Sequence, residues 1–220
     1  MPRRYYRRRR RRYRGPSRRF VRNVKKSMVK LASKHYYRQN LGQACYAVNT
    51  LATTAFSAAS GLVSLDEGDG ENQRDGRKVS WKYAKIHLEF VSSVSGSEII
   101  RFLIIHWKGD TTPTIGNILR PMTPDPNWYL SHYVKSTDAN KKFPYKILMD
   151  KKFALSTGTS SKLCTDVYLN LDGFTTDFNG SAGNNIEDGQ FYLIACSDEN
   201  TLGTPATFSW NALLGFSDNM

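Results

Sequence analysis

The first 65 residues of the chain contain 13 arginines and four lysines but no aspartate or glutamate. The remaining 155 residues hold the other 15 basic side chains and all 19 acidic ones. Like charges at this density repel one another and cannot be buried in a core, so they are typical of segments that bind a polyanion. The fold must therefore come from the second, mildly acidic part of the chain.

The basic segment has two parts with different patterns. Residues 1–16 consist mainly of arginine and tyrosine and end in Gly-Pro, and this composition predicts disorder. Over residues 17–36, apolar side chains recur at helical spacing among basic ones, namely at Phe20, Val24, Met28 and Leu31. We therefore predict a basic arm over 1–40, disordered over 1–16 and an amphipathic helix over about 17–36. The body is then expected to span 41–220.

The six consecutive arginines Arg7 to Arg12 form the densest part of this arm. Arginine is always charged and donates two parallel hydrogen bonds to a phosphate. The interleaved Tyr5, Tyr6 and Tyr13 offer rings on which unpaired bases can stack. Binding of this kind releases counterions, depends steeply on salt and reads no base sequence.

The arm therefore supplies the predicted nucleic-acid-binding residues. These are Arg3, Arg4, Arg7, Arg8, Arg9, Arg10, Arg11, Arg12, Arg14, Arg18, Arg19, Arg22, Lys25, Lys26, Lys30 and Lys34. The same residues would serve as a nuclear localisation signal and engage host import machinery. A membrane-surface role for residues 17–34 is the alternative. It fits less well, because Phe20 is the only aromatic residue on the apolar face, and we expect no membrane partner.

Beyond the arm the pattern becomes that of strands. Residues 79–92 alternate, with Ala84, Ile86, Leu88 and Phe90 on one face, and 98–107 are almost continuously apolar. Further strands are expected near 44–57, 145–156, 163–171, 189–196 and 205–216, with a short helix over 114–119. Short strands separated by turn residues predict an all-β sandwich or jelly roll of antiparallel sheets.

The chain shows no motif for catalysis. It contains no Gly-Lys dipeptide, hence no phosphate-binding loop, and no HExxH or GxSxG pattern. The four histidines are scattered, and we expect His87 and His106, inside predicted strands, to be ordinary packed or surface residues. We therefore predict no enzyme activity, no catalytic residue, no metal ligand and no cofactor.

Two smaller features of the sequence are an acidic loop and three widely spaced cysteines. The acidic loop Asp66 to Glu71 is expected to be a solvated turn that pairs with Arg74 and Arg77; a low-affinity structural Ca²⁺ at a subunit interface is the alternative. The widely spaced Cys45, Cys164 and Cys196 are expected to be small buried residues in a reducing compartment.

The body contains four notable stretches, GDGENQRDGRKVSWKYAKIHL (68–88), RFLIIHWKGDTTPT (101–114), YKILMDKKFALST (145–157) and FNG (178–180). In this order they resemble the coat protein family of satellite tobacco necrosis virus. Asn72-Gln73-Arg74 and Thr111-Thr112-Pro113-Thr114 are the most specific matches. The resemblance covers roughly residues 45–180, and it implies an eight-stranded single jelly roll of two four-stranded antiparallel sheets.

The start of the chain, MPRRYYRRRRRRYRG, instead resembles the capsid proteins of circoviruses, which have circular single-stranded DNA genomes. Together the two resemblances imply a T=1 icosahedral capsid, a homo-60-mer whose arms point inward onto a single-stranded genome, DNA favoured over RNA. They also imply a protein found in the virion and, during assembly, in the host nucleus. The alternative is a cellular nucleic-acid-binding protein with a basic tail, of ribosomal or chromatin type.

Overall fold

The computed structural model of the chain divides it into two units, residues 1–33 and 34–220. The structure describes residues 34–57, 60–70, 72–92, 97–109, 111–123, 126–134, 144–155, 161–199 and 205–218. The predicted disordered segment 1–16 and the predicted helix up to residue 33 lie outside these ranges. Within them, no helix is long and apolar enough to span a bilayer.

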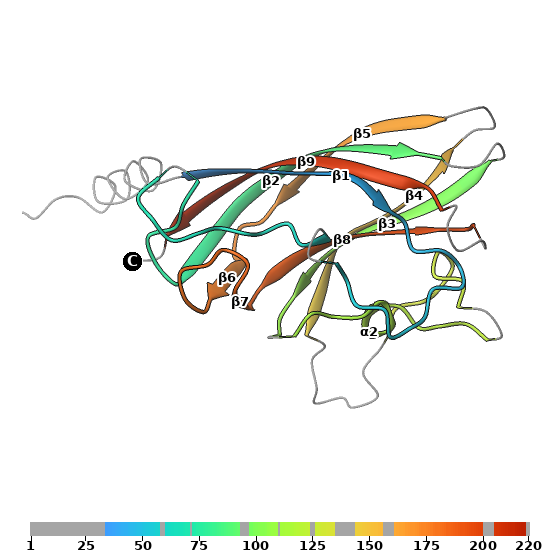
Figure 1. Cartoon of the computed structure of the whole chain (residues 1–220), viewed down its shortest axis with the longest axis horizontal. Coiled ribbons are helices and arrows are strands. Elements are labelled where there is room, and N and C mark those ends of the chain that lie inside the picture. The colour runs from blue at the N-terminus through green and yellow to red at the C-terminus, as the bar shows by residue number, and fades with distance from the viewer. Residues whose placement is uncertain are drawn as a thin grey trace, which may run out of the picture. The chain divides into compact units, whose positions relative to one another are not determined.

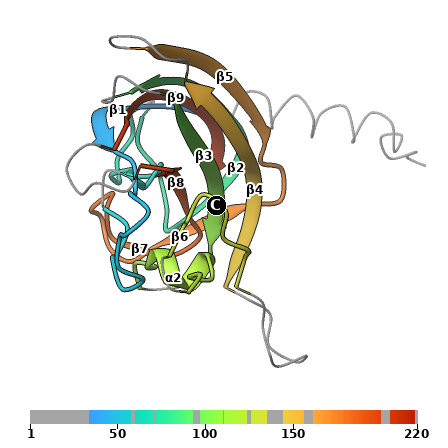
Figure 2. The ribbon, with the colours of Figure 1, turned by 90° about the vertical axis from the view of Figure 1, so that its right-hand side faces the viewer.

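The described part is an antiparallel β sandwich with one short helix (Figures 1 and 2). Its elements are β1 (Lys34–Ala44), β2 (Lys78–Val91), β3 (Glu98–Trp107), α2 (Ile115–Ile118), β4 (Tyr145–Leu155), β5 (Lys162–Asn170), β6 (Thr175–Phe178), β7 (Ile186–Asp188), β8 (Gln190–Ser197) and β9 (Thr207–Asp218). The larger sheet has the order β1-β9-β2-β6-β7, with β5 also paired to β2, and the smaller sheet has the order β4-β3-β8.

The strand order is that of a jelly roll. Strands β5 and β6 pair with different stretches of β2 and so act as one interrupted strand. Beside β8, Gly61 forms a bridge with Tyr192, and the Leu62 N–H donates to the Phe191 carbonyl, so this segment takes the fourth place in the smaller sheet. Eight strand positions in chain order then form sheets 1-8-3-6 and 2-7-4-5, which confirms the predicted fold. The short edge strand β7 is an addition that the sequence did not predict.

The alternation along the strands builds the core between the sheets. The four residues predicted to share one face of β2 are all buried, with exposures of 3% or less. The inward residues of β9, from Phe208 to Phe216, are buried as predicted and pack with Ile100, Phe102 and Ile104 of β3. Burial of each large apolar side chain contributes about 1.5–3 kcal/mol, so this layer supplies most of the stabilising free energy.

The smaller sheet is also covered on its outer face, which explains the continuous apolar pattern of β3. There Leu103, Ile105 and Trp107 form a second buried cluster with Ile115 and Ile118 of α2, the helix predicted over 114–119. Arg101, a buried charge within this apolar run, is satisfied by a two-pronged contact with Asp150 of β4, at 3.0 and 2.8 Å. The contact with Arg101 outweighs burial and lowers the pKa of the Asp150 carboxyl.

The first strand is where the sequence prediction was wrong. Residues 34–36 were expected to end the basic helix, but they belong to β1, which pairs with β9 from Lys34 onward. Conversely, residues 45–57, predicted as a strand, form turns and isolated bridges such as Tyr46 to Cys196. Pairing with β9 overrides the local helical preference. Since β1 begins at Lys34, "the arm" means residues 1–33 from here on.

Candidate nucleic-acid interface

All predicted nucleic-acid-binding residues from Arg3 to Lys30 lie outside the described residues, and only Lys34 is within them. Lys34 is the first residue of β1, and therefore the point at which the arm joins the body. Its ammonium group lies 2.5 Å from Asp75 and 3.1 Å from Asp218, and it donates to the Gln73 carbonyl at 3.1 Å. We call these four residues the arm clamp.

The charged groups of the arm clamp shift one another's pKa values. Burial opposes the charge of Lys34, but hydrogen bonds to Asp75 and Asp218 outweigh it and raise the lysine's pKa. The hydrogen bond from Lys34 lowers the pKa of Asp75. Burial, and then the like charge of Asp75, raise the pKa of Asp218. These contacts therefore fix the first residue of β1 to groups from both ends of the body.

The clamp is held in place by the Asn72-Gln73-Arg74 motif. Arg74 is fully buried, and its guanidinium donates to the carbonyls of Leu65 (3.0 Å), Gly76 (2.6 Å) and Gly180. Its guanidinium carbon also lies 4.3 Å from the centre of the Phe178 ring. The loop thus wraps around one buried charge and presents Gln73 and Asp75 to Lys34. Sequence reasoning chose this motif by resemblance and missed its physical role.

The acidic residues of the same loop are used locally. A carboxylate oxygen of Asp66 accepts the Gly183 N–H at 2.7 Å. Glu67 lies 3.9 Å from the Arg74 guanidinium and is 48% exposed. Within the described ranges, which leave out Glu71, no three His, Cys, Asp or Glu side chains gather closely enough to hold a metal ion.

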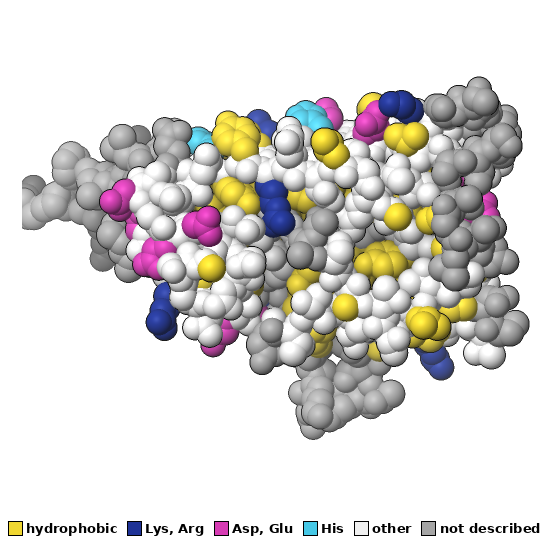
Figure 3. All heavy atoms as spheres, in the orientation of Figure 1, with side chains coloured by type: hydrophobic (Ala, Val, Ile, Leu, Met, Phe, Trp, Pro, Cys, Tyr) yellow, Lys and Arg dark blue, Asp and Glu magenta, His cyan; other side chains and the backbone are white. Residues whose placement is uncertain are grey.

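The outer face of the larger sheet presents exposed rings. Alternate residues of β1, β9, β2 and β5 point outward there, and the cross-strand register places Tyr37, Leu213, Lys85 and Tyr168 in one row. Tyr37 and Tyr168 are 63% and 66% exposed. Tyr168 also stacks on Tyr83, with ring centres 6.3 Å apart and planes 18° from parallel. Hydrophobic, basic and acidic side chains follow one another along the upper edge of Figure 3, over these strands.

Both acidic side chains on this outer face are paired with basic ones. His87 Nδ1 lies 2.6 Å from Asp166, and Lys162 donates to Glu89 at 3.2 Å. Beside them runs a groove of about 410 Å³, lined by Gln39, Leu41, His87, Glu89, Cys164 and Asn211 among others. Leu41 is 74% exposed, and Cys164 is exposed too, contrary to its predicted burial; Cys45 and Cys196 are buried.

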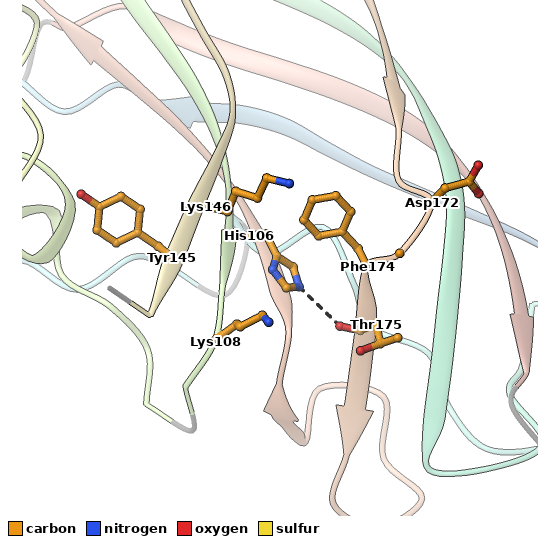
Figure 4. A pocket seen from close by; sticks show the side chains of 8 residues that line it. His106, Lys108, Tyr145, Lys146, Asp172, Phe174 and Thr175 are labelled. Atoms are coloured by element: carbon orange, nitrogen blue, oxygen red, sulfur yellow. Dashed lines mark hydrogen bonds between the residues drawn. The ribbon is translucent and has the colours of Figure 1, made fainter. Parts of the chain in front are cut away.

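A second hollow of about 350 Å³ opens at His106 (Figure 4). In that view Lys108 and Lys146 extend toward the side on which His106 and Phe174 lie. The His106 Nε2 is 3.4 Å from the Thr175 carbonyl oxygen, and its buried Nδ1 has no hydrogen-bond partner among the described residues. Burial, reinforced by the two lysines, lowers the histidine's pKa. His106 is thus a packed core residue, as its strand position predicted, and His87 is a surface one.

Comparisons with known proteins give little beyond this geometry. No family model matches the chain, and no curated protein sequence matches it. Among solved structures, the T13 particle of infectious bursal disease virus (IBDV) matches with 9% identity over 86% of this chain and 40% of that chain, at a TM-score of 0.16. The VP2 subviral particle of that virus gives 10% identity, 85% and 41% coverage, and a TM-score of 0.14.

Both neighbours are viral capsid particles, and this chain spans about two fifths of the length of theirs. TM-scores this low carry no weight for function. The function is therefore inferred from the charge distribution and the fold of the chain itself.

Proposed function

We propose that this chain is a viral capsid protein that assembles into a small icosahedral shell of sixty copies and packages a single-stranded genome with its arm. The observation that carries the proposal is the division of charge at Lys34. Residues 1–33 hold 15 basic and no acidic side chains, whereas residues 34–220 hold 17 basic and 19 acidic ones. A polycation is thus tied, through the arm clamp, to a nearly neutral jelly roll.

This division suits a closed shell. Nearly neutral bodies can lie edge to edge without strong mutual repulsion, while the arms concentrate positive charge in one place. Sixty arms of 15 charges each would bring about 900 positive charges, enough to neutralise a single-stranded genome of roughly one kilobase. The proposed role is structural rather than catalytic, and the proposed sites of action are the virion and, during assembly, the host nucleus.

The decisive experiment is electron microscopy of the purified full chain, combined with its ratio of absorbance at 260 and 280 nm. Closed particles that contain nucleic acid are expected. Because β1 begins at Lys34, the matched truncation removes residues 1–33 and leaves the strand intact. It should keep a folded β body and lose the nucleic acid. Monomers or small oligomers of the full chain would instead favour the cellular nucleic-acid-binding protein.

A second variant tests charge without changing length. Replacing Arg7 to Arg12 with glutamine removes six charges and should lower the slope of log affinity against log salt, for single strands, by about 4. An unchanged slope would refute the electrostatic mechanism. Digestion of the packaged nucleic acid by deoxyribonuclease, and not by ribonuclease, is the expected result for the DNA genome we propose.

A further inference from the structure

We propose that the outer face of the β1-β9-β2-β5 sheet is a second nucleic-acid site, which binds unpaired bases by stacking. This inference rests on the proposed function, because it requires that the chain carries single-stranded nucleic acid. It adds a base-dependent contact to the arm, whose predicted contacts are mainly to phosphate. We call this face the stacking face and define it by Tyr37, Tyr83, Lys85, Tyr168 and Leu213.

The first argument is the arrangement of rings. Tyr37 on β1 and Tyr168 on β5 stand at the two ends of one row across four antiparallel strands. With neighbouring strands about 4.8 Å apart, the backbone positions of the two tyrosines lie about 14 Å apart. Four-stranded sheets that expose rings in this way stack two or three unpaired bases. The separation suits two non-adjacent bases of one single strand better than a single small ligand.

The second argument is that Tyr37 and Tyr168 gain little free energy from burial in the fold. Three large side chains of this sheet, Tyr37, Leu41 and Tyr168, are more than half exposed. A tyrosine that is two-thirds exposed buries little apolar area and so contributes little to stability. The smaller sheet covers its outer face with α2 and the second apolar cluster. Over the described residues, no corresponding cluster covers the stacking face.

The third argument is charge. Glu89 is paired with Lys162, so it repels an incoming phosphate weakly, and Asp166 is held in a contact with His87. In the middle of the row, Lys85 lies with its ammonium 5.9 Å from the Tyr83 ring centre, and no salt bridge to it is found among the described residues. A phosphate beside a stacked base would meet this ammonium. The face therefore offers both rings for bases and a cation for the backbone.

The fourth argument is position. β1 starts at Lys34, so a polyanion held by residues 1–33 is tethered to the same strand that carries Tyr37. The high local concentration makes even a weak stacking contact effective. This tether favours nucleic acid over a second copy of the chain as the occupant of the face.

The test compares two oligomers that carry equal charge. Full-length protein is titrated with oligo(dT) and with an abasic oligomer of the same length, at a salt concentration that weakens the arm's contribution. Stacking is worth on the order of tenfold or more in affinity per base. Wild-type protein should therefore prefer oligo(dT) by roughly a hundredfold if two bases stack.

The double variant Tyr37→Ala/Tyr168→Ala should lose most of this preference and keep its affinity for the abasic oligomer. Tyr37→Phe/Tyr168→Phe keeps the rings and should keep the preference. Leu51→Ala, at a 71% exposed apolar residue away from this sheet, is the matched control and should change neither affinity.

Three outcomes would overturn the inference. A preference that survives the double alanine variant assigns stacking to the arm tyrosines. Equal affinity of wild-type protein for both oligomers excludes base stacking but leaves phosphate packaging intact. Particles that fail to assemble in the alanine variant while the base preference stays unchanged make this face a contact between copies of the chain.

Discussion

The buried Arg74 offers the sharpest test of how the fold holds the arm. Its side chain is fully buried and donates to three backbone carbonyls, of Leu65, Gly76 and Gly180. Arg74→Met keeps an apolar side chain of similar length, and with it much of the packing on Phe178. What it removes is the set of hydrogen bonds, so the variant isolates their value.

The magnitude follows from the partners left behind. A hydrogen bond to a charged group contributes about 1.5–3 kcal/mol, and a buried carbonyl left without a donor costs about 1–3 kcal/mol. Relief of burying a charge offsets part of this loss, since the nearest carboxylate, Glu67, is half exposed at 3.9 Å. We therefore expect Arg74→Met to lower the free energy of unfolding by about 3 kcal/mol. Arg74→Lys, which lacks the planar fork, should lose nearly as much.

Urea unfolding of disassembled protein, followed by tryptophan fluorescence, measures this difference from the midpoint at constant m-value. Hydrogen exchange of the loop 65–76 reports whether the loss is local. A midpoint for Arg74→Met within experimental error of wild type would refute the reasoning, because the three carbonyls would then not need their donor. In that case the Asn72-Gln73-Arg74 motif would have no structural role in the arm clamp.

Three further results are expected. Burial lowers the pKa of His106 below its unfolded value of about 6.5, so the folded state binds fewer protons and stability should fall as the pH drops through that value. The variant His106→Gln should therefore show a flatter slope of melting temperature against pH between pH 7.5 and 5. A slope equal to that of the wild type would contradict this prediction. Gly189→Ala should destabilise the fold by about 3 kcal/mol, because a Cβ at this φ of +84° would lie 2.1 Å from the Thr175 carbonyl oxygen. Gly173→Ala is the control: its φ is +88° but the space around it is open, so it should cost about 1 kcal/mol. Equal losses of stability in thermal unfolding would refute the steric cause. Excess EDTA should leave the melting temperature and assembly unchanged, because Asp66 already bonds to the Gly183 N–H; a lower melting temperature would restore the Ca²⁺ alternative.

The strands that the sequence predicted well are those whose pattern is local. The alternation from Ala84 to Phe90 and the apolar run of β3 are both recognisable within about ten residues, and the side chains that they place in the core are buried. β1 could not be read in this way, because its middle residues Arg38, Gln39 and Asn40 are polar and its partner β9 is far away in the chain. The short strands β6 and β7 are likewise defined by pairing rather than by composition.

The arm clamp could be predicted even less, because its contacts join residues that are far apart in the sequence. The arm's charge is visible in the composition, but the clamp joins Lys34 to Asp218, near the opposite end of the chain. Arg74 reaches Gly180, which is 106 residues further on. An arginine inside an acidic, glycine-rich loop is the available signal for a buried charge, but the same pattern also predicts a solvated turn with a surface ion pair.

The position of the arm clamp has a mechanical consequence. If the arm binds a condensed genome, as we propose, it is a tether under load, and that load enters the body at the first residue of β1. β1 is an edge strand, paired only with β9, so an outward pull peels it from its end instead of shearing all its bonds at once. The clamp lies where peeling must begin, and it therefore sets the force threshold of the whole strand. Single-molecule pulling on the arm should show a lower rupture force for Lys34→Met, and an unchanged force would place the resistance elsewhere.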